Sequence, residues 1–508
     1  MLRLLLALAV LTPSAAAQAS YRVTLPTGGL DGDALAHFER GVELLHSFEY
    51  DDARDAFRDA RRAAPTPWMA AWGEAMTHNH PVWQRQDRDA GLAALGATGE
   101  DPGLCGSSGR PARYGKWEGY VDAVCVLFGA PGTATADMSK EDRDDAYLAS
   151  MAALAGSDAS DRDARAFHAL ALLGSAHEGR DYAVYERAAR VAQSVLDEDP
   201  QHPGALHYLI HAYDDPDHAE LALPAARAYS QIASAASHAL HMPTHIYFAL
   251  GLWEEASALN TRAYRAAADA SARRGETLNN HGWHALYWLN YSELQLGRDD
   301  AALALLDTAL VRYGADPSPL ALAHLVRMRA QTAVTVSLTR TGDLDAASPL
   351  GRALALVLPL DSASASTRAA DLALGVVTTG PDGDAELMRR AQGVLDDPDA
   401  GELARASATM SGGLEFGSDD ETVRRALVGA AEAIEATPVT FGPPMPALFP
   451  HEMLVLAGLT HGDAARCVLD AVEARAPARR IAAFLRDGLD EDPAPSEPAP
   501  PLRPSFCD

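Results

Sequence analysis

Apolar positions recur along most of the chain at intervals of three or four residues, the spacing of one face of an α-helix. Alternation of apolar and polar residues, which is typical of strands, is scarce. The pattern therefore predicts an all-α chain. Its length exceeds that of one compact domain, so a helical repeat array is the architecture we expect.

Small and aromatic residues near the N-terminus predict paired antiparallel helices. Within residues 33–65, the spacing of a tetratricopeptide (TPR) repeat is met by Gly41, Leu44, Ala53, Phe57, Ala60 and Pro65. Gly41 and Ala53 allow two helices to pack closely, and Phe57 is placed to fill the gap to the next pair. Gly73 follows Gly41 by 32 residues, close to the TPR period of roughly 34.

Similar inter-helix turns recur further along the chain. They read Gly179-Arg-Asp-Tyr-Ala183, Asp217-His-Ala219, Gly251-Leu-Trp-Glu-Glu-Ala256, Gly297-Arg-Asp-Asp-Ala301 and Gly342-Asp-Leu-Asp-Ala346. Counted from alanine to alanine, the steps are 36, 37, 45 and 45 residues, which are helix-hairpin periods longer than the ideal TPR. We therefore predict a TPR-like helical-hairpin superhelix, that is, an α-solenoid.

The first residues have the pattern of a secretory signal peptide. Arg3 precedes an apolar run from Leu4 to Leu11, and Ala17-Gln18-Ala19 forms an A-x-A site. We expect cleavage after Ala19, with cleavage after Ala17 as the alternative. The apolar run is far shorter than the ~20 residues that span a bilayer, and no later segment is a candidate span. The mature protein is expected to be soluble and exported, either periplasmic or secreted.

The remaining chain divides into four expected segments. Residues 33–96 would form N-terminal TPR-like hairpins, and residues 97–140 a glycine-rich insertion with a cysteine pair. Residues 141–480 would form the TPR-like superhelix, and residues 490–508 a Pro-rich C-terminal tail.

Charge and cysteine content restrict the partners and the compartment. The net charge of −28 argues against nucleic acid as a partner. Four cysteines fit an exported, oxidised protein, and they allow three pairings. Proximity in sequence favours Cys105–Cys125 and Cys467–Cys507, and neither spacing is typical of a metal knuckle.

Histidine is concentrated between residues 202 and 284, which hold nine of the eighteen. Six of the nine form pairs spaced three or four residues apart, so each pair lies on one helix face: His207 and His211, His241 and His245, His281 and His284. Each pair precedes an inter-helix turn. The pairs therefore fall on the first helices of consecutive hairpins, which line the concave surface in TPR-like stacks. This placement favours one shared site.

Several further residues are candidate extensions of that site. His168 lies on the preceding first helix, and His78 and His80 would face the same groove if the superhelix curls round. Asp214 would serve as a carboxylate ligand or accept a hydrogen bond from a histidine N–H. His202 and His218, which lie next to loop prolines, are interpreted as turn and capping groups.

Neutral imidazoles bind transition metals, so we predict zinc, copper or iron as a candidate cofactor. The competing interpretation is structural, because helical histidines and the surrounding aromatic residues also serve as inter-helix packing. No zincin motif, P-loop, dinucleotide fingerprint or nucleophile elbow is present.

Two functions remain open from the residues. The first is an exported binding protein whose concave groove takes a peptide, a protein or a small ligand. The alternative is a metal-dependent enzyme, a hydrolase or an oxidoreductase, that uses the histidine pairs as ligands.

Four histidine-containing stretches together resemble a known group of proteins. They are Trp72-Gly-Glu-Ala-Met-Thr-His78-Asn-His80-Pro, His202-Pro-Gly-Ala-Leu-His207-Tyr-Leu-Ile-His211, Ala239-Leu-His241-Met-Pro-Thr-His245-Ile and His281-Gly-Trp-His284. The chain resembles secreted or periplasmic bacterial TPR-domain proteins with recurrent His-Pro-Gly…His-Tyr…Ile-His and His-Met-Pro-Ser-His motifs. Thr244 stands where serine is more usual. The resemblance spans about Asp33 to Leu310 and implies architecture and export, not a reaction.

Overall fold

The computed structural model describes most of the chain. The described residues are 21–64, 67–97, 103–106, 117–232, 236–313, 317–339, 363–364, 368, 372, 385–400, 404–405, 408, 421–436, 449–456, 460–491 and 504–507. The expected signal peptide, the turn at Gly342 and most of the Pro-rich tail lie outside them.

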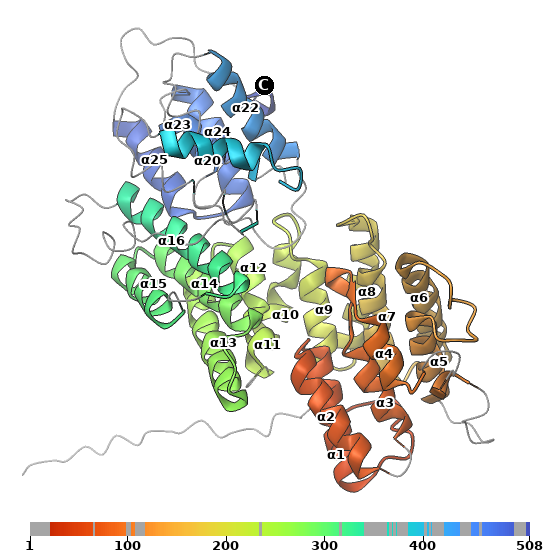
Figure 1. Ribbon diagram of the computed structural model, residues 1–508. Coiled ribbons are helices and arrows are strands. Elements are labelled where there is room, and N and C mark those ends of the chain that lie inside the picture. The colour runs from red at the N-terminus through yellow and green to blue at the C-terminus, as the bar shows by residue number, and fades with distance from the viewer. Residues whose placement is uncertain are drawn as a thin grey trace, which may run out of the picture.

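The fold is all-α and is built from successive helical hairpins, as predicted (Figure 1). The N-terminal part contains α1 (Gly32–His46), α2 (Tyr50–Ala63), α3 (Trp68–Met76) and α4 (Arg88–Ala94). Between α3 and α4, β1 (Asn79–His80) pairs antiparallel with β2 (Arg85–Gln86) around the 3-10 turn η1 (Pro81–Trp83). Phe57 packs against both Gly41 and Gly73, where a Cβ atom would lie 2.6 and 2.3 Å from its ring. The small residues therefore let the helices approach, as the repeat spacing indicates.

The next helices extend the stack. They are α5 (Trp117–Phe128), α6 (Lys140–Ser157), α7 (Arg162–Gly174) and α8 (Tyr182–Leu196), preceded by η2 (Gly103–Cys105). Helix α5 lies within the segment expected to be an insertion and packs against α3 and α6. A disulfide joins Cys105 of η2 to Cys125 of α5, as sequence proximity predicts.

The central part of the chain is a run of hairpins. It contains α9 (Pro203–Ala212), α10 (Ala219–Ile232), α11 (Ser237–His241), α12 (Pro243–Ala249), α13 (Trp253–Arg274), α14 (Asn280–Gln295), α15 (Asp299–Tyr313) and α16 (Pro319–Thr339). The first helices of neighbouring hairpins are in contact with each other. The pairs in contact are α7 with α9, α9 with α12, α11 with α14, and α14 with α16. The turns at Gly251 and Gly297 have φ of 67° and 69°, which glycine adopts without strain.

The chain turns back so that α1 packs on α9, and the largest described buried core has members from Leu25 to Met328. The remaining described helices are α20 (Ala385–Leu395), α22 (Glu421–Ala436), α23 (Pro450–Leu456), α24 (Gly462–Arg475) and α25 (Arg480–Glu491), with η4 (Ser505–Cys507). The second predicted disulfide, Cys467–Cys507, ties η4 to α24.

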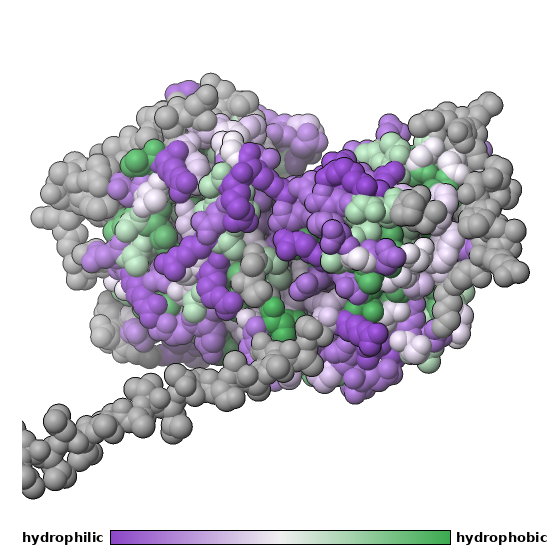
Figure 2. Space-filling view, turned by 90° about the horizontal axis from the view of Figure 1, so that it is seen from below, coloured by the Kyte–Doolittle hydropathy of each residue, from purple (hydrophilic) through white to green (hydrophobic). Residues whose placement is uncertain are grey.

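The surface is largely polar. Hydrophilic side chains cover much of the coloured part of the face shown in Figure 2, with hydrophobic side chains scattered among them. Of the helices described here, none is both long and apolar enough to span a bilayer.

Candidate metal centre

His207 and His211 lie together on α9, and His281 and His284 lie together on α14, but His241 and His245 lie on two short helices, α11 and α12. Five of these six histidines belong to two separate groups. His241, His245 and His284 each offer a nitrogen within 4.8 Å of the other two, and we call this group site 1. The same holds for His207, His211 and His238, which form site 2. The sequence pattern favours one shared site, whereas the structure has two neighbouring ones. His238 was missed, although its i,i+3 spacing to His241 was available as a signal.

Site 1 is built around a break between α11 and α12. Pro243 has no N–H, so the helical hydrogen-bond ladder is interrupted there. The Thr244 hydroxyl donates to the carbonyl oxygen of His241 at 2.6 Å, and the His245 N–H bonds to Met242 instead. Across this break, the rings of His241 and His245 lie nearly perpendicular, at 81°.

Two of the three imidazoles of site 1, those of His241 and His245, face each other through their Nε2 atoms, which are 3.1 Å apart. The Nδ1 of His245 lies 2.7 Å from a carboxylate oxygen of Asp214, and the Nδ1 of His241 lies 2.7 Å from Oδ1 of Asn260. Both oxygens only accept hydrogen bonds, so each Nδ1 carries the proton and each Nε2 presents a lone pair. In this tautomeric state two lone pairs point at each other, and a cation between them would satisfy both.

A shared proton is a poor candidate for that cation at neutral pH. Burial, and then the charge of His245, lower the pKa of His241 well below its usual value. Burial likewise lowers the pKa of His284. Two nitrogens bound to one tetrahedral zinc ion at 2.0–2.1 Å lie about 3.3 Å apart, close to the observed separation. The Asp214–His245 pair has the arrangement in which a carboxylate orients a metal-bound histidine.

Site 2 joins α9 to α11. His207, His211 and His238 are all buried, with 0 to 5% of each residue exposed. Among the described residues, no group hydrogen-bonds to the Nε2 atom of any of the three. A buried polar atom without a partner costs about 1–3 kcal/mol, so three of them at one place require an explanation.

The loop between α1 and α2 completes site 2, and sequence reasoning missed it. The carbonyl oxygen of His46 accepts a hydrogen bond from Nδ1 of His207 at 2.7 Å. This contact fixes the proton on Nδ1 and leaves Nε2 as a lone pair. Phe48 packs against all three histidines of site 2 and is held at φ 56°, an uncommon backbone conformation for a bulky residue. Glu49 accepts a hydrogen bond from the backbone N–H of His238 at 2.7 Å.

The structure also has a third histidine group, which holds the fold together. Oδ2 of Asp163 accepts hydrogen bonds from the N–H groups of Thr24 and Leu25, at 2.5 and 3.0 Å. Its Oδ1 accepts from Tyr21 and His46, and His202 lies 3.2 Å from the same oxygen. Burial would raise the pKa of Asp163, but the contacts with His202 and His46 hold it well below its usual range. We call this group the buried knot (His46, Asp163, His202).

His202 has the capping role that the sequence indicates. Its Nδ1 accepts a hydrogen bond from the backbone N–H of Ala205 at the start of α9. Its contact with Asp163 was not foreseen, because the two residues are 39 positions apart. Each histidine nitrogen of the buried knot lies within 3.2 Å of a protein atom, so we interpret this group as a structural element.

The glycine of the His-Pro-Gly motif, Gly204, packs against His46 of the buried knot. A Cβ atom on Gly204 would lie 2.2 Å from Nδ1 of His46. We expect Gly204→Ala to lower the free energy of unfolding by about 1–3 kcal/mol through overpacking, measured by urea denaturation. Gly156→Ala is the control, since nothing lies within 4 Å of its Cβ position in α6, and its stability should stay equal or rise. Equal effects of the two substitutions would contradict this explanation.

The remaining candidate histidines differ in how close they lie to site 2. The ring of His80 stacks on Tyr50 at 3.9 Å and lies 6.4 Å from Trp83, which in turn borders His211 and His238. His281 lies 4.8 Å from His238, ring to ring, and 3.6 Å from Glu49. His281 therefore borders site 2, whereas Trp83 separates His80 from it. His78 and His168 are in neither group.

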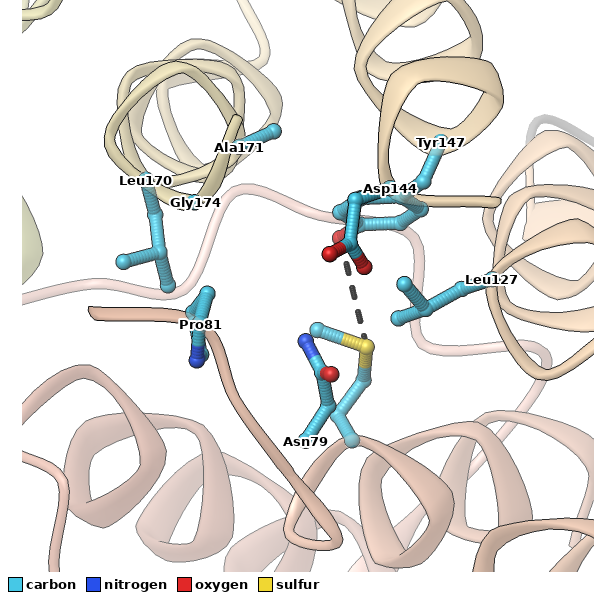
Figure 3. A pocket seen from close by; sticks show the side chains of 9 residues that line it. Asn79, Pro81, Leu127, Asp144, Tyr147, Leu170, Ala171 and Gly174 are labelled. Atoms are coloured by element: carbon cyan, nitrogen blue, oxygen red, sulfur yellow. Dashed lines mark hydrogen bonds between the residues drawn. The ribbon is translucent and has the colours of Figure 1, made fainter. Parts of the chain in front are cut away.

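A small pocket lies elsewhere, between α3, α5, α6 and α7 (Figure 3). It is mostly apolar, and its wall includes Asp144, whose pKa is raised by burial. Tyr147 donates to the sulfur of Met76 at 3.9 Å across it. The pocket shares no residue with the two histidine sites.

Comparisons with known proteins assign neither a family nor a function. No protein-family model matches the chain, and no curated protein matches it. Among solved structures, a similar chain is that of a Rap protein complexed with competence and sporulation factor. It is 13% identical over 79% of this chain and 99% of that chain, with a TM-score of 0.31. This likeness is too low to assign a function.

Proposed function

We propose that this protein is an exported binding protein of the helical-hairpin class that holds a transition-metal ion at site 1. The observation that carries the proposal is the 3.1 Å approach of the Nε2 atoms of His241 and His245, with both Nδ1 atoms bonded to oxygens. Zinc, copper and iron all accept imidazole ligands. The ligand set contains no thiolate, and both cysteine pairs are used in disulfides.

Metal binding to the purified mature protein tests this proposal. The metal-free protein is titrated with Co²⁺, whose visible absorption reports a low-coordinate nitrogen site, and then with Zn²⁺ in competition. We expect His245→Gln to weaken binding at site 1 by more than about 100-fold, because it removes a ligand. Asp214→Asn should weaken it by about 10–100-fold, as loss of an orienting carboxylate does at other metal sites.

His168→Ala is the matched control for these variants. His168 is a half-buried helical histidine whose pKa is also lowered by burial, but it lies outside both sites. Its replacement should leave metal affinity unchanged. A wild-type protein that takes up neither Co²⁺ nor Zn²⁺ when correctly folded would contradict the proposal.

A metal-dependent enzyme is the second candidate function. It is favoured by the number of protein ligands, since three histidines leave one position of a tetrahedral ion open to water or substrate. Zinc-bound water can reach a pKa of about 7 and act as a nucleophile. Hydrolysis of an activated ester that requires added Zn²⁺ and disappears in His245→Gln would favour the enzyme. A peptide, protein or small molecule held beside the ion without turnover would favour the binding protein.

Export is part of the same proposal. The N-terminal A-x-A pattern and the two disulfides support a periplasmic or secreted location, where cysteine pairs stay oxidised.

A further inference from the structure

We propose that His207, His211 and His238 of site 2 hold a second transition-metal ion, so that the histidine region is a two-metal centre. The proposal extends the function proposed above to a second ion. It rests on different residues, so each can fail while the other stands.

The first support is the convergence of buried nitrogens. One nitrogen from each of the three residues lies within 4.8 Å of the other two. Their rings are 4.7 Å apart for His207 and His211, and 5.2 Å apart for His207 and His238. Buried polar atoms in proteins are nearly always hydrogen-bonded, yet no described group bonds to these three Nε2 atoms. A cation bound by all three would satisfy them at once.

The second support is that the rings are held in place before any ion binds. His207 is fixed by its hydrogen bond to the carbonyl of His46 and by stacking on Tyr229 at 5.5 Å. Phe48 stacks on both His211 and His238, at 5.5 and 5.8 Å. Because the fold already fixes these side chains, binding an ion loses little side-chain conformational entropy, which favours binding.

The third support is the local charge. Glu49 bonds to the backbone of His238 and lies 3.6 Å from His281, so one carboxylate stands beside the three neutral imidazoles.

Trp83, which is 40% exposed, borders His211 and His238 and places this side of site 2 near the surface. Three protein ligands again leave a coordination position for water or an anion.

The two sites share helices. His238 and His241 are three residues apart on α11, and their ring neighbours on α14 are His281 and His284, at 4.8 and 4.6 Å. Asp214 follows α9, the helix of His207 and His211, yet it orients His245 of site 1. Because the two sites share α11 and α14, two bound cations would lie close together and repel each other. Binding of the first ion should therefore weaken binding of the second.

Stoichiometry tests the second ion. The full-length mature protein is stripped of metal, titrated with Zn²⁺ by calorimetry and analysed for bound zinc after desalting. We expect two equivalents for the wild type, one for His211→Gln/His238→Gln, one for His241→Gln/His245→Gln, and none when the four substitutions are combined. His207 is left intact because its contact with His46 supports the fold.

The other results of this titration show which of the two ions is absent, provided that each variant is folded. Far-ultraviolet circular dichroism and intact disulfides establish that each variant is folded. His238→Gln alone serves if the site 2 double variant is not. A folded wild type that binds one zinc ion, with unchanged affinity in the site 2 variant, would overturn the second ion and leave site 1 standing. One ion lost only from the site 2 variant would instead overturn site 1.

Discussion

Metal-free protein is expected to unfold steeply as the pH falls below about 6.5. Burial lowers the pKa of His207 to about 3 and holds the pKa values of His211, His238 and His241 well below 6.5. Below pH 6.5 the unfolded chain binds protons that the folded protein does not, so stability falls as the pH falls. Each residue contributes about 1.4 kcal/mol per pH unit, and the four together about 5 kcal/mol per unit.

The stability lost over one pH unit is therefore a large part of the 5–15 kcal/mol free energy of unfolding that is typical of folded proteins. Urea denaturation at a series of pH values between 7 and 5 measures it. Zn²⁺ should move the loss of stability to lower pH, because the ion binds only neutral imidazoles in the folded state. His238→Gln should reduce the slope by about one proton, because burial lowers the pKa of His238 in the folded protein. A stability that is flat between pH 6.5 and 5 would contradict the neutral, buried state of these residues.

Asp163→Asn is expected to destabilise the protein by about 3–5 kcal/mol, the cost of breaking a buried charged group away from its partners. The carboxylate joins the segment Tyr21–Leu25 to α7 and, through His46 and His202, to α1 and α9. An amide cannot accept all of these hydrogen bonds, because its NH₂ group is a donor. Urea denaturation gives the change in stability.

Hydrogen exchange would locate the effect of this substitution. The backbone N–H groups of Thr24 and Leu25, which donate to Asp163, should exchange faster in Asp163→Asn because the segment loses its attachment to α7. Asp89→Asn is the control, since Asp89 is exposed in the first turn of α4, and its effect should stay within about 0.5 kcal/mol. Equal stability losses for the two variants would show that the buried knot does not anchor the N-terminal segment.

The helical hairpins could be predicted from the sequence because their determinants are local. The 3.6-residue periodicity, the Gly–Phe–Gly packing around Phe57 and the turns at Gly251 and Gly297 all depend on residues close to one another in the chain. The disulfide pairs follow from proximity for the same reason. The positions of the histidine pairs on first helices also follow from local spacing.

The division into two sites could not be predicted, because it depends on long-range packing. Spacing on one helix does not show that His284 approaches His241 while His281 approaches His238. Nor does it show that α1 packs on α9, which brings Phe48 and the carbonyl of His46 to site 2 from about 160 residues away. The sequence offers Asp214 as an acceptor for a histidine N–H, but only the fold shows that this histidine is His245.

The most direct test of the central claim is anomalous diffraction from crystals of the mature protein grown with Zn²⁺ and measured at the zinc absorption edge. The account predicts an anomalous peak about 2.0–2.1 Å from nitrogens of His241, His245 and His284, and a second one beside His207, His211 and His238. Absence of anomalous density at both places, with waters hydrogen-bonded to the imidazoles instead, would contradict it.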